Sequence, residues 1–126
     1  MNKKRVIIAL FFLMIAIILG AFGAHGLKSL ISPEKITSFE VGIRYQMYVG
    51  LILLILGLNE NKFNFSLRLV SNLLVLGGIL FSISIYIPSL QELTSMSLKF
   101  FGPITPLGGS LMIVSLVILM FKLAKN

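Results

Sequence analysis

The chain has 126 residues, of which 57% are hydrophobic and only 12% are charged, and its mean hydropathy is +1.03. Soluble domains carry about 25% charged residues, so this composition predicts a single domain embedded in lipid. The absence of cysteine excludes disulfides and thiol chemistry, and a single histidine excludes a histidine cluster that could hold a metal. The net charge of +7 does not predict nucleic-acid binding, because the basic residues lie in short segments between apolar runs.

Four apolar runs occupy most of the sequence. A bilayer core about 30 Å thick needs about 20 helical residues, and the second run reaches this length only if its helix begins before Arg44. Backbone groups in lipid find hydrogen-bond partners only within the protein, so long runs without barrel-like alternation predict helices. The runs lie at residues 6–24, 45–58, 69–90 and 100–121.

Local signals set the expected ends of these helices. The sequence Ser-Pro-Glu at 32–34 combines a capping hydroxyl, a proline that needs no donor and an acid at the positive end of the helix dipole. Thr105 and Pro106 repeat the hydroxyl and the proline, and Pro88 should close the third helix. The predicted fold is an all-α integral membrane protein, a single membrane domain over residues 1–126 with four transmembrane helices in a compact bundle. The expected helices are about 5–26, 33–58, 66–88 and 105–122.

The first run could instead belong to a signal peptide. The basic sequence MNKKR precedes it, and the small residues AFGA at 21–24 offer a possible cleavage point. The run is longer than the roughly 7–15 apolar residues usual in signal peptides, and its removal would leave three helices without a partner. We therefore expect it to remain as the first span.

The distribution of Lys and Arg predicts that both termini are cytoplasmic. Seven basic residues fall in the N-terminal tail, the second loop and the C-terminal tail, whereas four fall on the other side. The more basic side of a multi-pass protein usually faces the cytoplasm. The acids Glu34, Glu40 and Glu92 all fall on the opposite, outer side and widen the difference.

Polar side chains gather toward the outer side under this topology. Arg44 lies about 21 Å before the helix end expected at Leu58, at 1.5 Å per residue, where an ionised side chain needs a partner or a path to the headgroups. Glu40 lies one turn earlier and could form a self-contained ion pair with it. The other interpretation is an outer pocket that holds an anionic headgroup or a small ligand. The candidate cluster is His25, Glu40, Arg44, Tyr45, Tyr48, Tyr86 and Thr105.

Small residues predict close helix packing, because they let backbones approach in a solvent that gives no hydrophobic drive. The stretch GPITPLGGS at 102–110 places two prolines and three glycines at the head of the last helix. We expect a sharp helix start there and packing against glycines of the first helix; the alternative is irregular backbone that lines a small cavity. Asn72 is expected to form an interhelical hydrogen bond. The expected packing positions are Ala16, Gly20, Ala24, Gly77, Gly78, Gly108 and Gly109.

No catalytic constellation is visible in the sequence. No histidine–acid pair stands beside a serine at a recognisable spacing, and no acid lies inside an apolar run, which disfavours catalysis and ion-coupled transport. The leading interpretation is a structural or accessory bundle that binds membrane lipids, or that packs against another copy of itself or a larger membrane complex. We expect no enzymatic activity, no cofactor and no nucleic-acid partner. A small oligomeric transporter or channel is the alternative. A membrane enzyme acting on lipid would need a paired acid or base that the sequence lacks.

The order of several motifs resembles one family. GAFGAHGL at 20–27, RYQMY at 44–48, the glycine- and serine-containing segment that ends at Tyr86, and GPITPLGG at 102–109 resemble the bacterial family called domain of unknown function 423, to which animal transmembrane-protein-256-like proteins are related. The resemblance implies a four-helix protein of the bacterial inner membrane and no particular reaction. Two departures are Val49, where many relatives have histidine, and VSLV at 114–117, where many have a Gly-Trp pair. A role that needs the second histidine is not expected here.

Overall fold

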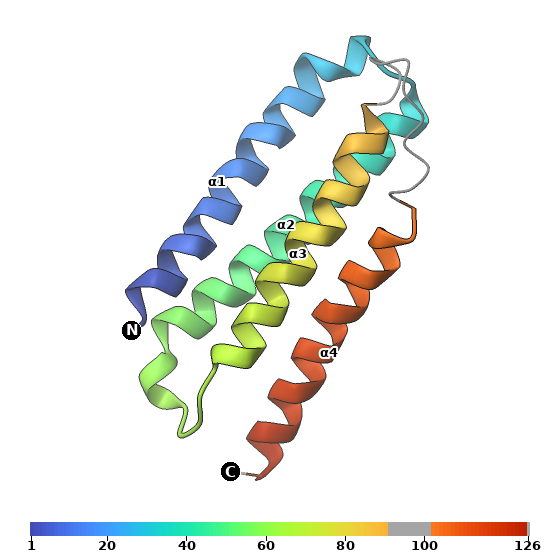
Figure 1. The fold of residues 1–126 in the computed structure, drawn as a ribbon. Coiled ribbons are helices and arrows are strands. Elements are labelled where there is room, and N and C mark those ends of the chain that lie inside the picture. The colour runs from blue at the N-terminus through green and yellow to red at the C-terminus, as the bar shows by residue number, and fades with distance from the viewer. Residues whose placement is uncertain (91–101, 126) are drawn as a thin grey trace.

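Four long helices make up most of the described chain. The computed structural model describes residues 1–90 and 102–125, and in this part four helices are long and apolar enough to cross a membrane. Successive helices run in opposite directions (Figure 1). The expected all-α membrane fold with four spans is therefore confirmed. The elements are α1 (Lys3–His25), the 3₁₀ turn η1 (Leu27–Ser29), α2 (Pro33–Leu58), the 3₁₀ turn η2 (Glu60–Lys62), α3 (Arg68–Ser89) and α4 (Ile104–Lys125).

The first two long helices begin at side-chain caps. Asn2 caps α1, because its side-chain oxygen accepts a hydrogen bond from the N–H of Arg5 at 3.0 Å. Ser32 caps α2 by accepting from the N–H of Lys35 at 3.4 Å, with Pro33 as the first helical residue. The helix ends differ from the sequence-based ranges by at most three residues. The polar connection expected at 91–99 lies outside the described residues.

The start of α4 differs from the expectation. α4 begins at Ile104, so Pro106 lies in the first turn, where a missing N–H would have no helical partner in any case. The hydroxyls of Thr105 and Ser84 are hydrogen-bonded at 2.6 Å, so Thr105 links α4 to α3. Gly102 and Pro103 form an exposed turn before the helix. This stretch is therefore not irregular backbone lining a cavity.

The helices pack in sequence order. α1 packs on α2, α2 on α3 and α3 on α4, while α1 and α4 lie at opposite sides of the bundle (Figure 1). The main core includes the fully buried side chains of Ala9, Leu53 and Val70, from three different helices. A smaller core at the other end contains Leu27 and Phe39. Because α1 contributes to the main core, the first apolar run is part of the fold.

Two glycines bring the backbones of α3 and α4 into contact. A Cβ atom added at Gly108 would lie 2.5 Å from the backbone nitrogen of Phe81 and 2.8 Å from the carbonyl oxygen of Gly77. A Cβ atom at Gly77 would lie 2.7 Å from the carbonyl oxygen of Gly108, whereas one at Gly109 would meet the Phe81 ring at an ordinary 3.7 Å. α4 therefore packs on α3 through Gly108. The expected packing of α4 against glycines of the first helix is wrong.

Small residues of α1 face α2 instead. A Cβ atom at Gly23 would lie 3.2 Å from the Phe39 ring, and one at Gly20 would lie 4.0 Å from Ile43. Ala16 is also buried, but Ala24 is exposed. The small-residue pattern of α1 thus serves the α1–α2 contact, and Ala24 lies outside it.

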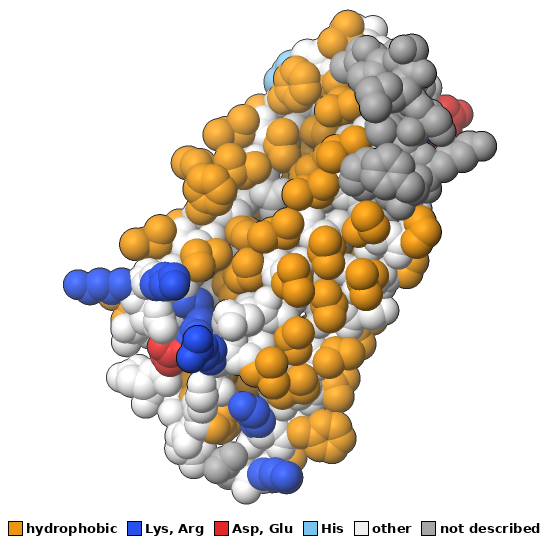
Figure 2. Space-filling view, in the orientation of Figure 1, with side chains coloured by type: hydrophobic (Ala, Val, Ile, Leu, Met, Phe, Trp, Pro, Cys, Tyr) orange, Lys and Arg blue, Asp and Glu red, His pale blue; other side chains and the backbone are white. Residues whose placement is uncertain are grey.

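The surface of the bundle separates apolar from basic side chains. Figure 2 shows apolar side chains over most of the length of one face, and Lys and Arg side chains gathered at the end that carries the N-terminus and the end of α4. Large apolar side chains such as Ile17, Ile113 and Met120 are more than 60% exposed. Exposure of this kind is expected where the surrounding solvent is lipid. We call the end with the termini and η2 the inner end, and the end with η1 the outer end.

The inner end is expected to face the cytoplasm, because it carries the excess of Lys and Arg. In intact cells, Asn61→Cys in η2 should resist a membrane-impermeant thiol reagent, while Ser29→Cys in η1 should react. Both side chains are exposed, so differences in burial do not explain the contrast. Lysed cells, in which both cysteines should react, are the control. Labelling at residue 61 but not at 29 in intact cells would reverse the orientation.

Candidate functional site

A buried amide and a phenol connect three helices. Gln46 of α2 is 6% exposed; its Nε2 donates to the carbonyl oxygen of Phe12 on α1 at 2.8 Å, and its Oε1 accepts from the hydroxyl of Tyr86 on α3 at 2.7 Å. The ring of Tyr86 also packs on Phe39, with centroids 5.1 Å apart. A polar group in an apolar interior is costly unless it is hydrogen-bonded. Gln46 therefore fixes α1, α2 and α3 relative to one another at this depth.

A groove between α1 and α3 passes over this pair. Its volume is about 490 Å³, and nearly all of its lining side chains are apolar, with Gln46, Ser82 and Tyr86 as the polar exceptions. Several of the apolar lining residues are themselves exposed on the lipid-facing surface, so the groove is open to lipid. We call it the α1–α3 groove. Its walls include Ile8, Phe11, Ile15 and Leu19 from α1, and Val75 and Ile79 from α3.

A polar cavity adjoins this groove at the inner end. It has a volume of about 370 Å³, and it shares Ile8 and Val75 with the α1–α3 groove. We call it the inner cavity. Its polar lining includes Lys4, Arg5, Glu60, Arg68, Ser71 and Asn72. Three cationic side chains and one carboxylate thus line this cavity.

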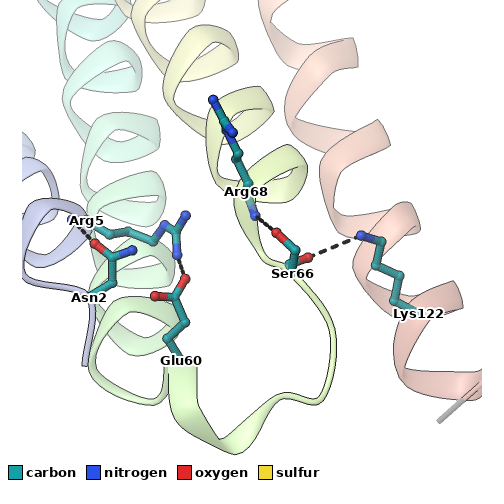
Figure 3. A network of polar contacts seen from close by, with 6 residues as sticks. All are labelled: Asn2, Arg5, Glu60, Ser66, Arg68 and Lys122. Carbon is teal, nitrogen blue, oxygen red and sulfur yellow. Dashed lines mark hydrogen bonds and ion pairs between the residues drawn. The ribbon is translucent and has the colours of Figure 1, made fainter.

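Hydrogen bonds and an ion pair hold the inner end together (Figure 3). Arg5 forms an ion pair with Glu60, which connects α1 to η2. The hydroxyl of Ser66 accepts from the N–H of Arg68 at 3.2 Å, and the carbonyl oxygen of Ser66 accepts from Lys122 Nζ at 3.2 Å. These contacts connect α1 to η2, and they connect the loop that precedes α3 to both α3 and α4.

The side chains of Ser71 and Asn72, which line the inner cavity, have no hydrogen bond within the described residues. Ser71 is only 3% exposed, and its buried hydroxyl has no hydrogen-bond partner within the described residues. Asn72 is exposed to the cavity and makes no interhelical hydrogen bond, contrary to the expectation. Buried polar atoms without partners are uncommon in folded proteins, so Ser71 in particular suggests a missing partner.

The structure separates the candidate outer cluster among different parts of the bundle. Glu40, Arg44 and Tyr48 lie on the exposed face of α2, and His25 is exposed at the end of α1. Tyr86 points into the bundle, and Tyr45 packs against the Phe81 ring with centroids 4.8 Å apart. Thr105 lies at the α3–α4 contact. Among these side chains, Tyr45 and Tyr48 share a hollow: their ring centroids lie 5.4 Å apart, and both line an apolar groove of about 460 Å³. The other five do not line that groove. The separated set is His25, Glu40, Arg44, Tyr45, Tyr48, Tyr86 and Thr105.

Glu40 and Arg44 do not form the expected ion pair in the structure. Both side chains are exposed, and the one ion pair among residues 1–90 and 102–125 joins Arg5 to Glu60. Their shared face of α2 continues into Leu51 and Ile55, which are also exposed. The Arg44 side chain therefore lies on the outer surface of the bundle, from where a long side chain can reach the lipid headgroups.

The sequence reasoning missed Gln46 and Ser71. Gln46 is the polar residue at the centre of RYQMY, and an amide at the second position of the apolar run 45–58 was the available signal. Ser71 gave no signal, because serine in a membrane helix commonly bonds its own backbone. Within the part of the chain that the structure describes, no group of three His, Cys, Asp or Glu side chains could hold a metal ion.

Comparison with known proteins places the chain in a family. The family described as "Protein of unknown function (DUF423)" matches residues 19–109. The chain belongs to this family. The DUF423 match covers the end of α1, all of α2 and α3 and the start of α4, so it includes Gln46, Tyr86 and the α3–α4 glycine contact. No solved structure matches the chain.

Relatives of this DUF423 chain are bacterial membrane proteins. The UPF0382 membrane protein SAB0533 of Staphylococcus aureus is 40% identical over 114 residues, which cover 88% of this chain and 89% of the relative. The UPF0382 membrane protein SH2409 of Staphylococcus haemolyticus is 34% identical and covers 98% of this chain and 97% of its own length. The UPF0382 membrane protein YwdK of Bacillus subtilis is 33% identical, with 89% of each chain covered. This DUF423 chain is accordingly a multi-pass protein of the bacterial cytoplasmic (inner) membrane.

Proposed function

We propose that this protein is a lipid-binding accessory bundle that holds an acyl chain in the α1–α3 groove. The observation that supports this is the groove itself, which has almost wholly apolar walls and opens toward lipid between two helices that make little direct contact. Apolar clefts of roughly 300–1,000 Å³ are typical of small-ligand sites, and this one is about 490 Å³. We infer that the protein acts by binding rather than by catalysis, alone or beside a larger membrane complex.

Transport is less well supported by the distribution of polar groups. Gln46 and Tyr86 lie at one depth, and Ser71 and Asn72 lie nearer the inner end. The α3 residues between these two levels include the apolar Leu74, which is fully buried. A continuous water-lined path would need polar groups at this level too. A lipid chain, by contrast, needs an apolar path of this kind.

Filling the groove tests the proposal. Ile79→Trp adds bulk to a groove-lining position of α3, whereas Leu76→Trp adds the same bulk to an exposed position on the same helix that does not line the groove. Native mass spectrometry of protein purified in gentle detergent should show a retained phospholipid on the wild type and on Leu76→Trp. Retention should fall several-fold in Ile79→Trp. Equal retention in both variants, or no retained lipid on the wild type, would contradict an acyl-chain site in this groove.

A further inference from the structure

We propose that the inner cavity binds the phosphate of an anionic phospholipid whose acyl chain lies in the α1–α3 groove. This inference rests on the proposed function and adds the headgroup class and the leaflet, namely the one at the inner end. The physical basis is the junction of a basic polar cavity with an apolar groove. A phospholipid has the same division into a charged headgroup and an apolar tail.

The charge of the inner cavity favours an anion. Lys4, Arg5 and Arg68 line it together with a single acid, Glu60. The ion pair between Arg5 and Glu60 balances that acid within the protein, which leaves Lys4 and Arg68 as the cations in excess. Basic pockets between membrane helices on the cytoplasmic side are recognised sites for anionic headgroups.

The direction of Arg68 supports this interpretation. Figure 3 shows its side chain extending from the start of α3 along the helix, away from Ser66 in the preceding loop and from Lys122 on α4. A basic side chain that served only as a topology signal would be expected to extend toward water at the helix end. Arg68 instead lies along the wall of the inner cavity, where a guanidinium can form paired hydrogen bonds with phosphate oxygens.

Unpaired polar groups provide a second observation. The Ser71 hydroxyl is buried, lines the cavity and has no partner within the described residues, and Asn72 beside it is also without a hydrogen bond. A phosphate or glycerol oxygen of a headgroup would supply these partners. Lys4 and Arg68 are exposed, as is Lys62 outside the cavity, so the buried hydroxyl of Ser71 is what distinguishes this place from the rest of the inner end.

The continuity of the two spaces favours a lipid over a soluble anion. Ile8 and Val75 line both the inner cavity and the α1–α3 groove. Along α1 the groove continues from Ile8 to Leu19, a distance of about 16 Å at 1.5 Å per residue. A free phosphate would occupy only the polar part. A phospholipid from the adjoining leaflet can fill both.

The test compares two lipids that differ in headgroup charge. Protein in detergent is mixed with phosphatidylglycerol and phosphatidylcholine that carry identical acyl chains, and bound lipid is counted by native mass spectrometry. The wild type should retain phosphatidylglycerol preferentially. Arg68→Gln should lower that retention about tenfold, because it removes charge-assisted hydrogen bonds to the phosphate. It should change the weaker retention of phosphatidylcholine less, because the choline cation offsets the phosphate charge and is repelled by the cations that line the cavity. Ser71→Ala should also lower the retention of phosphatidylglycerol, by a smaller factor. Lys62→Gln, an exposed basic position at the same end outside the cavity, is the matched control and should have no effect.

The outcomes separate this inference from the proposed function. If both lipids are retained equally and Ile79→Trp displaces both, the groove holds an acyl chain but the headgroup inference is wrong. If neither lipid is retained, both proposals fail. If inorganic phosphate displaces phosphatidylglycerol at the same concentration from the wild type and from Ile79→Trp, the cavity is a site for a free anion and the lipid assignment is overturned. An equal loss in Lys62→Gln and Arg68→Gln would show a general charge effect and also overturn it.

Discussion

Gly108→Ala is expected to destabilise the bundle by about 3 kcal/mol, the upper part of the range usual for overpacking. The added methyl group would lie 2.5 Å from the backbone nitrogen of Phe81 and 2.8 Å from the carbonyl oxygen of Gly77. Both atoms belong to the backbone, so no side-chain rotation can relieve the contact. α4 would have to move away from α3, and the hydrogen bond from the Ser115 hydroxyl to the Val70 carbonyl, now 2.8 Å, would lengthen with it.

Gly109→Ala is the matched control for this substitution. It places the same methyl group one residue later, where the nearest atoms are in the Phe81 ring at 3.7 Å, an ordinary contact. Thermal unfolding of the purified variants in one detergent should therefore show a large loss for Gly108→Ala and little change for Gly109→Ala. Equal stability of the two variants would mean that α3 and α4 are not in backbone contact at Gly108.

Gln46→Leu should have the second largest effect, a loss of about 1–2 kcal/mol. The substitution removes the bond to the Phe12 carbonyl and leaves the Tyr86 hydroxyl without its acceptor between three helices. Single hydrogen bonds in membrane proteins average only about 0.6 kcal/mol, so the stranded hydroxyl is what raises the expected loss. The measurement is a denaturant titration of wild type and variant in the same micelle.

A double-mutant cycle with Tyr86→Phe identifies the source of this effect. Removing the hydroxyl also removes the stranded donor, so Gln46→Leu with Tyr86→Phe should lose less stability than the sum of the single variants. Tyr48→Phe is the control, because the Tyr48 hydroxyl is exposed and makes no hydrogen bond within the described residues. Strict additivity of Gln46→Leu and Tyr86→Phe would indicate that the two side chains do not interact.

The sequence did not predict which polar side chains of the candidate site point into the bundle. Polar residues were expected to gather at the outer end because their positions along the helices had similar depths. Depth does not fix direction, since residues two positions apart on a helix, such as Arg44 and Gln46, point to nearly opposite sides. The structure accordingly places Arg44 on the exposed face and Gln46 in the interior. In a chain apolar on every side, hydrophobic periodicity gave little indication of which direction was inward.

The number and length of the helices, and their ends to within three residues, follow from the sequence alone. Each apolar run has to satisfy its backbone hydrogen bonds within the segment when lipid surrounds it, and local residues such as Ser32 and Pro33 set a helix start. The sequence does not determine which helices pack against each other. Lipid and apolar side chains offer nearly the same environment, so burial alone does not favour one neighbouring helix over another. Only the tertiary structure showed that Gly108 meets Gly77 rather than a glycine of α1, and that α1 and α3 leave a groove between them. Those contacts depend on shape complementarity between specific faces, which neither composition nor spacing along the chain specifies.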